Sequence, residues 1–273
     1  MSTLLMAAGL ATAAAPARAQ LLAQVTPVKV SVTARPGEPV TRDVLLTNQS
    51  EAPVVVRVRL SDWTLSEQGE MDLVPAGSTP NSLAGRVAFE PREFSLQPGE
   101  SGHVRVTLSL PADGPATRWG VLLSEMRPAD AVSMRFGPRA IIELGTTLYL
   151  SRVPADLVRA DVTGMDVHPL GDAVSVSVRI RNAGERHFYV AGEIALADSS
   201  GTRLGTGQLG KGVVLPGGLR ELTWTCECGL HPGRYQVTAT LDTGEPQLIV
   251  GETWFQWPVP APVPPPLAQQ TQR

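Results

Sequence analysis

Cysteine and aromatic residues are scarce in this chain, and neither sign of charge dominates it. Only two cysteines, Cys226 and Cys228, occur in 273 residues, which excludes a scaffold held by several disulfides. Stability must therefore come from packed hydrophobic cores. The 23 basic residues are spread along the chain and nearly balance 26 acidic ones, so no basic patch indicates nucleic acid or an anionic membrane surface. We expect a protein partner and no nucleic acid.

Long apolar runs are missing beyond the N-terminus. Residues 4–15 are small and apolar, and Ala17-Arg18-Ala19 follows, which fits signal-peptidase cleavage before Gln20. No lysine or arginine precedes this run, and it is too short for a permanent membrane anchor. We expect residues 1–19 to be a signal peptide and the mature protein to be periplasmic or extracellular, without an integral membrane segment. The alternative is an alanine-rich leader that is not cleaved.

Alternation of apolar and polar residues is the pattern that is abundant. It is typical of half-buried strands, and no segment after the leader has a sustained helical period. Many of the 26 glycines and 24 prolines lie between the alternating runs, where a sheet must reverse. The sequence thus predicts an all-β protein of two tandem immunoglobulin-like β-sandwich domains. The clearest alternating runs are residues 28–32, 56–60, 104–110, 174–180 and 235–241.

A proline interrupts the chain near residues 151–156, and new alternating runs begin after it. We expect the first domain to cover residues 25–152 and the second to cover 157–258. Residues 259–273 are rich in proline and predict an extended tail. Such a tail is either a spacer or a ligand for a proline-binding partner.

Two motifs superficially suggest chemistry. Residues 205–210 match G-x-G-x-x-G, but the residues after them end in Pro216-Gly217 and cannot form the helix that a phosphate loop requires. Residues 99–103 resemble a protease serine loop, yet Pro98-Gly99-Glu100-Ser101 is better interpreted as a turn between strands. Four histidines and no paired carboxylate motif give no sign of a hydrolytic triad. We expect neither enzyme activity nor a cofactor.

The two cysteines are separated by one residue on a predicted strand. Their Cα atoms would lie about 6.5 to 7 Å apart, near the upper limit for a disulfide. A structural role, a bridge within or between chains, and a metal site with His231 all remain open, although a closed zinc site needs four ligands. Asn48-Gln49-Ser50 fits a glycosylation sequon and is interpreted more simply as a turn.

The first domain resembles the N-terminal domain of periplasmic chaperones from the chaperone-usher pilus pathway. The resemblance covers about 125 residues and depends on VLLTN at 44–48, a strand leading to Trp63, FEPREFSLQPGE at 89–100, WGVLLSE at 119–125 and the apolar run 140–150. It implies an edge strand that pairs with a pilus subunit lacking its own last strand, which is β-strand addition. The partner-binding residues implied are Ile141, Ile142, Leu144, Thr146, Leu148 and Tyr149.

The same family anchors the subunit's terminal carboxylate with an arginine on its first strand and a lysine on its last. Here Val32 or Thr33 stands at the first of these places, and no lysine occurs within residues 140–150. Lys29, Arg35, Arg139 and Arg152 flank the two strands without matching the anchor.

The second domain resembles immunoglobulin-like modules of bacterial cell-surface proteins over residues 181–184, 215–224 and 230–235. Tyr235, after a Pro-Gly turn, is a candidate tyrosine-corner residue with a structural role. Two hypotheses follow for the whole chain. It is either an exported chaperone that holds a pilus or surface-structure subunit, or a structural or adhesive surface protein. For the run 140–150, the alternative to an edge strand is that both of its faces are simply core of the first domain.

Overall fold

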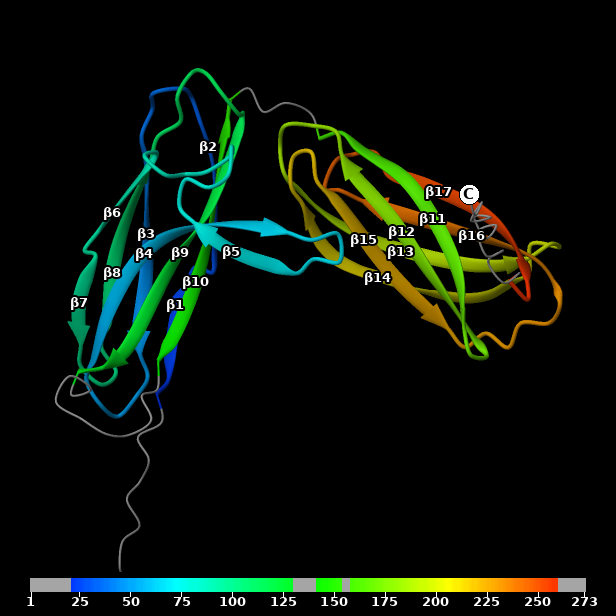
Figure 1. The fold of residues 1–273 in the computed structure, drawn as a ribbon, viewed down its shortest axis with the longest axis horizontal. Helices are drawn as coiled ribbons and strands as arrows, with labels where there is room; N and C mark the ends of the chain where they lie inside the picture. The colour runs from blue at the N-terminus through cyan, green and yellow to red at the C-terminus, as the bar shows by residue number, and fades with distance from the viewer. Residues whose placement is uncertain (1–20, 130–140, 154–157, 260–273) are drawn as a thin grey trace, which may run out of the picture.

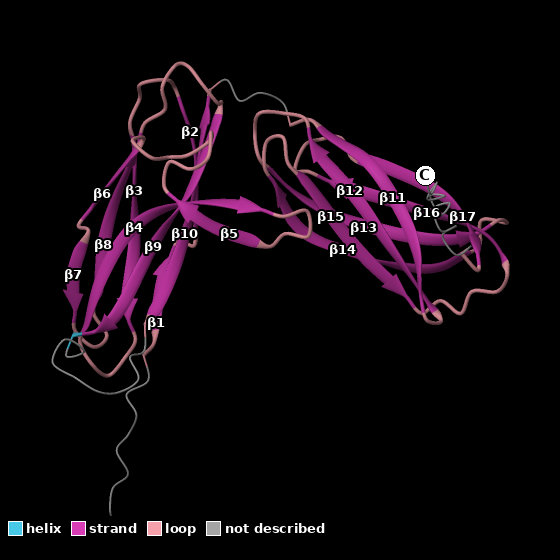
Figure 2. Ribbon diagram, viewed as in Figure 1, coloured by secondary structure: helices cyan, strands magenta, loops and turns pink. Residues whose placement is uncertain are grey.

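The computed structural model describes residues 21–129, 141–153 and 158–259. These residues form two β-sandwiches joined end to end, the all-β pair of immunoglobulin-like domains that the alternation predicts (Figures 1 and 2). The expected signal peptide, most of the proline-rich tail and most of the expected domain boundary lie outside the described residues.

The first sandwich holds β1 to β10. One sheet has the order β1-β3-β8-β6, and the other has the order β2-β10-β9-β4-β5, with β7 also paired to β4. All neighbours are antiparallel except β2 and β10, which run parallel. The strands are β1 (Ala23–Thr26), β2 (Lys29–Ala34), β3 (Val40–Asn48), β4 (Val54–Leu65), β5 (Met71–Pro75), β6 (Val87–Glu90), β7 (Glu93–Leu96), β8 (Ser101–Leu108), β9 (Thr117–Pro128) and β10 (Ile142–Arg152).

The second sandwich packs the sheet β11-β12-β15 against the sheet β14-β13-β16-β17. Its strands are β11 (Ala160–Leu170), β12 (Ala173–Asn182), β13 (Phe188–Asp198), β14 (Arg203–Val214), β15 (Leu219–Cys226), β16 (Gly233–Asp242) and β17 (Ile249–Trp257).

Each alternating run buries its apolar face between two sheets, as expected from the period of two. Val104, Val106 and Leu108 of β8 lie in the first core, and Val174, Val176 and Val178 of β12 lie in the second. The prediction is wrong at Val28, which is exposed although it shares the parity of the buried Val30. The reason is its place before β2, where the chain crosses from one sheet to the other.

A buried asparagine ends one long strand in each domain and organises the turn that follows. The Asn48 amide nitrogen donates to the carbonyls of Ala52, Leu96 and Gln97, at 2.9 to 3.2 Å, and its side-chain oxygen accepts from the Ser50 amide. The structure thus uses Asn48 as the turn residue that the sequence suggested. Asn182 makes the corresponding contacts in the second domain, to the carbonyls of Arg186 and Val214.

The motifs that imitate catalytic loops are structural. Gly99 has a φ of 74° in the turn before β8, and the Ser101 hydroxyl lies 2.8 Å from that of Thr47. Residues 205–210 lie inside strand β14 rather than at the start of a helix. Tyr235 donates its hydroxyl to the His231 carbonyl at 2.7 Å, which makes it a tyrosine-corner contact.

Candidate functional site

Strand β10 is paired along its whole length on one side and along only half its length on the other. Strand β9 pairs with it from Ile142 to Ser151, whereas β2 pairs with it only from Thr147 to Arg152. Among the described residues, no strand pairs with residues 142–146 on the β2 side. We call residues 142–146 the open edge, and the space beside them, in line with β2, the lane.

The six residues singled out from the sequence divide between the open edge and the paired half of β10. Ile142, Leu144 and Thr146 lie on the open edge, and Ile141 directly precedes it with 56% of its surface exposed. Leu148 and Tyr149 are buried where β10 runs between β9 and β2. Thr146 is also buried, and its hydroxyl donates to the Pro27 carbonyl at 3.0 Å. Strand addition at β10 would therefore involve Ile141, Ile142 and Leu144 and not the last three residues.

Main-chain groups of the open edge point into the lane. The Thr147 amide donates to the Val28 carbonyl at 3.0 Å, which fixes the side of β10 that faces β2. Because main-chain groups alternate along a strand, those of Glu143 and Gly145 face the same way. Exposed apolar side chains stand at both ends of the lane, since Val28 is 65% exposed at one end and Ile141 lies at the other.

Side chains of β10 alternate between two cores. Leu144 and Leu148 face the core of the first sandwich, while Tyr149 faces a separate cluster between the two domains. This interdomain cluster consists of Trp63, Trp119, Val121, Leu123, Tyr149 and Leu215, with Leu65 and Val213 packed against it. The sequence carried one signal of it, because β9 is apolar on both faces, and such strands are buried on both sides.

Aromatic rings connect the domains at this cluster. Tyr149 packs edge-on against Trp63 and stacks on His187 of the second domain, with ring centroids 4.0 Å apart. Burial raises the pKa of the Tyr149 phenol far above its usual range. Burial, together with the charges of Lys29 and Arg186, lowers the pKa of His187 to about 4, so the ring is neutral at pH 7.

The hairpin of β4 and β5 also reaches from the first domain to the second, as Figure 1 shows. The Glu221 amide of β15 donates to the Glu67 carbonyl in this hairpin at 2.7 Å. The Arg220 guanidinium lies against Gly69, where any side chain would collide with it. The β10 strand is thus presented on a frame of two domains in contact.

The basic residues that flank these strands in the sequence lie apart. Lys29 begins β2 and places its ammonium 4.2 Å from the centre of the Tyr189 ring. Arg152 donates to the Ala112 carbonyl at 2.8 Å, and Arg35 is exposed in the turn after β2. Arg139 lies outside the described residues.

Cys226 and Cys228 are joined by a disulfide, with their Cα atoms 5.2 Å apart. The expected spacing of 6.5 to 7 Å was wrong because Cys228 lies beyond the end of β15 rather than on the strand. The bridge packs against Gly205 of β14, beside Trp224. In the part of the chain that is described, no cluster of three or more His, Cys, Asp or Glu side chains could hold a metal ion.

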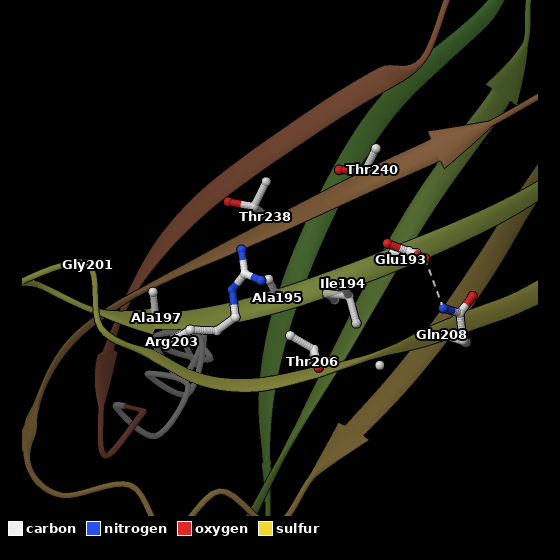
Figure 3. A pocket seen from close by; sticks show the side chains of 11 residues that line it. Glu193, Ile194, Ala195, Ala197, Gly201, Arg203, Thr206, Gln208, Thr238 and Thr240 are labelled. Carbon is white, nitrogen blue, oxygen red and sulfur yellow. Dashed lines mark hydrogen bonds between the residues drawn. The ribbon is translucent and has the colours of Figure 1, made fainter.

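A shallow groove of about 500 Å³ lies on the outer face of the second domain (Figure 3). Its floor is Ala195 and Ala197, and its walls carry Arg203, Thr206 and Thr238. This composition is that of a solvated sheet face.

Within the described ranges, no helix is long and apolar enough to cross a membrane.

No protein-family model and no curated protein sequence matches the chain. Solved structures similar to it include the CsuC–CsuE complex, a chaperone and tip adhesion subunit of archaic chaperone-usher Csu pili from Acinetobacter baumannii. The identity is 12%, the TM-score 0.46, and the match covers 85% of this chain and 97% of that one. Another is the Escherichia coli chaperone DraB, with 15% identity, a TM-score of 0.41, and a match that covers 86% of this chain and 97% of that one. A third is the Pseudomonas aeruginosa chaperone CupB2, with 15% identity, a TM-score of 0.39, and a match that covers 85% of this chain and 98% of that one.

Proposed function

We propose that this chain is an exported, chaperone-like protein that holds a pilus or surface-structure subunit by β-strand addition at the open edge of β10. The observation that carries the proposal is the incomplete pairing of this strand, whose residues 142–146 have β9 on one side and the lane on the other. An added strand would bond to the main chain of the open edge, and apolar side chains on both strands would set the specificity.

The surroundings of the lane support this use. A free sheet edge is a hazard that proteins commonly protect with charge, proline or a covering segment. Here Glu143 is the single charged residue of the open edge, and the exposed apolar residues Val28 and Ile141 lie at the ends of the lane. Rigid support for the strand comes from the interdomain cluster behind Tyr149. The disulfide between Cys226 and Cys228 suits an oxidising compartment such as the periplasm.

Co-expression with a candidate subunit tests the proposal. Ile142→Lys and Leu144→Lys place a charge on the open edge, and we expect each to reduce recovery of soluble subunit at least fivefold by removing apolar contacts. Leu144 also packs against the core of its own domain, so thermal unfolding must show that each variant is folded. Val250→Lys is the matched control, because Val250 is an exposed apolar residue on the edge strand β17 of the other domain. Equal recovery with all three variants would exclude strand addition at β10 and leave the structural or adhesive function.

A further inference from the structure

The open edge has a glycine near its centre that no turn requires. Gly145 lies within β10 and has no positive φ, unlike the turn glycines of this chain. A glycine inside a strand weakens it, since it costs backbone entropy and contributes no side chain to the sheet. Strand glycines often mark a place where another chain approaches closely.

The space above Gly145 is closed on one side and open on the other. On the β9 side, Leu123 stands directly opposite, and a Cβ atom at Gly145 would lie 3.2 Å from Val121. Towards the start of β10, the space is bordered by the ion pair of Glu143 with Arg59, whose charged atoms lie 2.7 Å apart. On the lane side, no described strand is hydrogen-bonded to residues 142–146, although β1 lies near β10, and no atom there comes within 4 Å of a Cβ placed at Gly145.

We propose that the strand received in the lane carries a large apolar side chain, best an aromatic one, beside Gly145. This inference rests on the proposed function and adds a size preference at one position of the client. The client residue next to Gly145 lies about 5 Å away across the sheet, so its ring leans over the glycine and takes the place of the missing side chain. The neighbouring client position towards the start of β10 meets the charged Glu143, which favours a polar partner, whereas β2 occupies the place beside Thr147.

Fluorescein-labelled peptides of seven residues provide the probe. Each alternates valine with threonine, and the second residue from either end is phenylalanine, valine or alanine, because β2 closes the lane at Thr147, two residues beyond Gly145. In anisotropy titrations, we expect the wild type to bind the phenylalanine peptide about three- to fivefold more tightly than the alanine peptide, the usual size of a cross-strand pair. Gly145→Val fills the space, so the two peptides should then bind equally. Gly145→Ala, which adds only a Cβ, should reduce the preference in part.

Thr147→Val is the matched control, because Thr147 lies on the same strand and face but beside β2. It should keep the preference for phenylalanine. Thermal unfolding of each Gly145 variant measures whether the protein tolerates the added side chain against Val121. A wild type without the preference, or a preference unchanged in both Gly145 variants, would overturn the inference. If Ile142→Lys and Leu144→Lys still abolish peptide binding in that case, the proposed function stands. Failure of every peptide to bind the wild type would count against both proposals.

Discussion

At the scale of single residues, the glycines of β14 have a steric cause. A Cβ atom at Gly205 would lie 2.7 Å from the Cys228 sulfur, and one at Gly207 would lie within 2.0 Å of the Trp224 indole nitrogen. Residues two apart share a face of a strand, so Gly205 and Gly207 lie on the same face of β14. The absence of side chains at these two positions leaves room for the Trp224 indole and the disulfide. A phosphate-binding loop has the same spacing for a different reason, which is why the motif alone could not distinguish the two.

Gly207→Val tests this account. The added side chain collides with Trp224, and we expect the free energy of unfolding to fall by about 1 to 3 kcal/mol, as in other overpacked cores. Thr206→Val on the same strand is the control, since Thr206 lines the outer groove and should be nearly neutral. Urea denaturation measures both. Equal midpoints for the two variants would contradict the steric explanation.

The lowered pKa of His187 predicts that the stability of the folded protein depends on pH. Its pKa is lowered to about 4 in the folded protein, by burial first and then by Lys29 and Arg186, whereas it is about 6.5 in an unfolded chain. The unfolded chain therefore binds more protons between these two pH values. The contribution of His187 to stability is fully present above pH 6.5 and is lost as the pH falls towards 4. The loss is on the order of 2 kcal/mol for this partly exposed ring.

The comparison of His187→Phe with the wild type isolates this effect, because phenylalanine keeps a ring against Tyr149 and cannot be protonated. Urea unfolding at pH 7 and pH 4.5 should show a smaller decrease in stability for the variant. His103→Gln is the control, since His103 is exposed and should leave the decrease as it is in the wild type. An unchanged decrease in His187→Phe would show that other groups dominate the acid response.

At the scale of elements, the sequence located strand β10 and the parity of its side chains but not its pairing. Alternation indicates which residues share a face, so Leu144 and Leu148 could be placed on one side and Tyr149 on the other. It does not indicate which strand lies alongside, because partners come from distant parts of the chain. The parallel pairing with β2, which covers Leu148 and Tyr149, was for this reason not predictable.

The open edge can be tested through its main chain alone. Glu143→Pro removes an amide hydrogen that faces the lane, and proline is tolerated where that hydrogen has no partner in the sheet. Glu143→Ala keeps the amide, and both variants lose the ion pair with Arg59. We expect the proline variant to bind the phenylalanine peptide about three- to tenfold more weakly than the alanine variant, the usual value of one hydrogen bond. Equal affinities would mean that no strand is added there.

At the scale of the whole molecule, the two domains were predictable from their alternation, but the contact between them was not. The contact depends on side chains from separate segments, such as Trp63 and Leu215, whose approach is decided by the relative placement of two finished sandwiches. His187 likewise carries no sequence signal for its stacking on Tyr149. Because this cluster is buried between the domains, we expect them to unfold together rather than independently.

Leu215→Lys tests this coupling, because it places a charge in the interdomain cluster, where the leucine is 8% exposed. A charge there must be hydrated, so the domains should separate at a cost of about 3 kcal/mol. We expect one calorimetric transition for the wild type and two for the variant, with a larger radius of gyration in X-ray scattering. Leu204→Lys changes an exposed leucine of the same domain and should leave a single transition. If Leu215→Lys also unfolds in one transition, the domains are not coupled through this cluster.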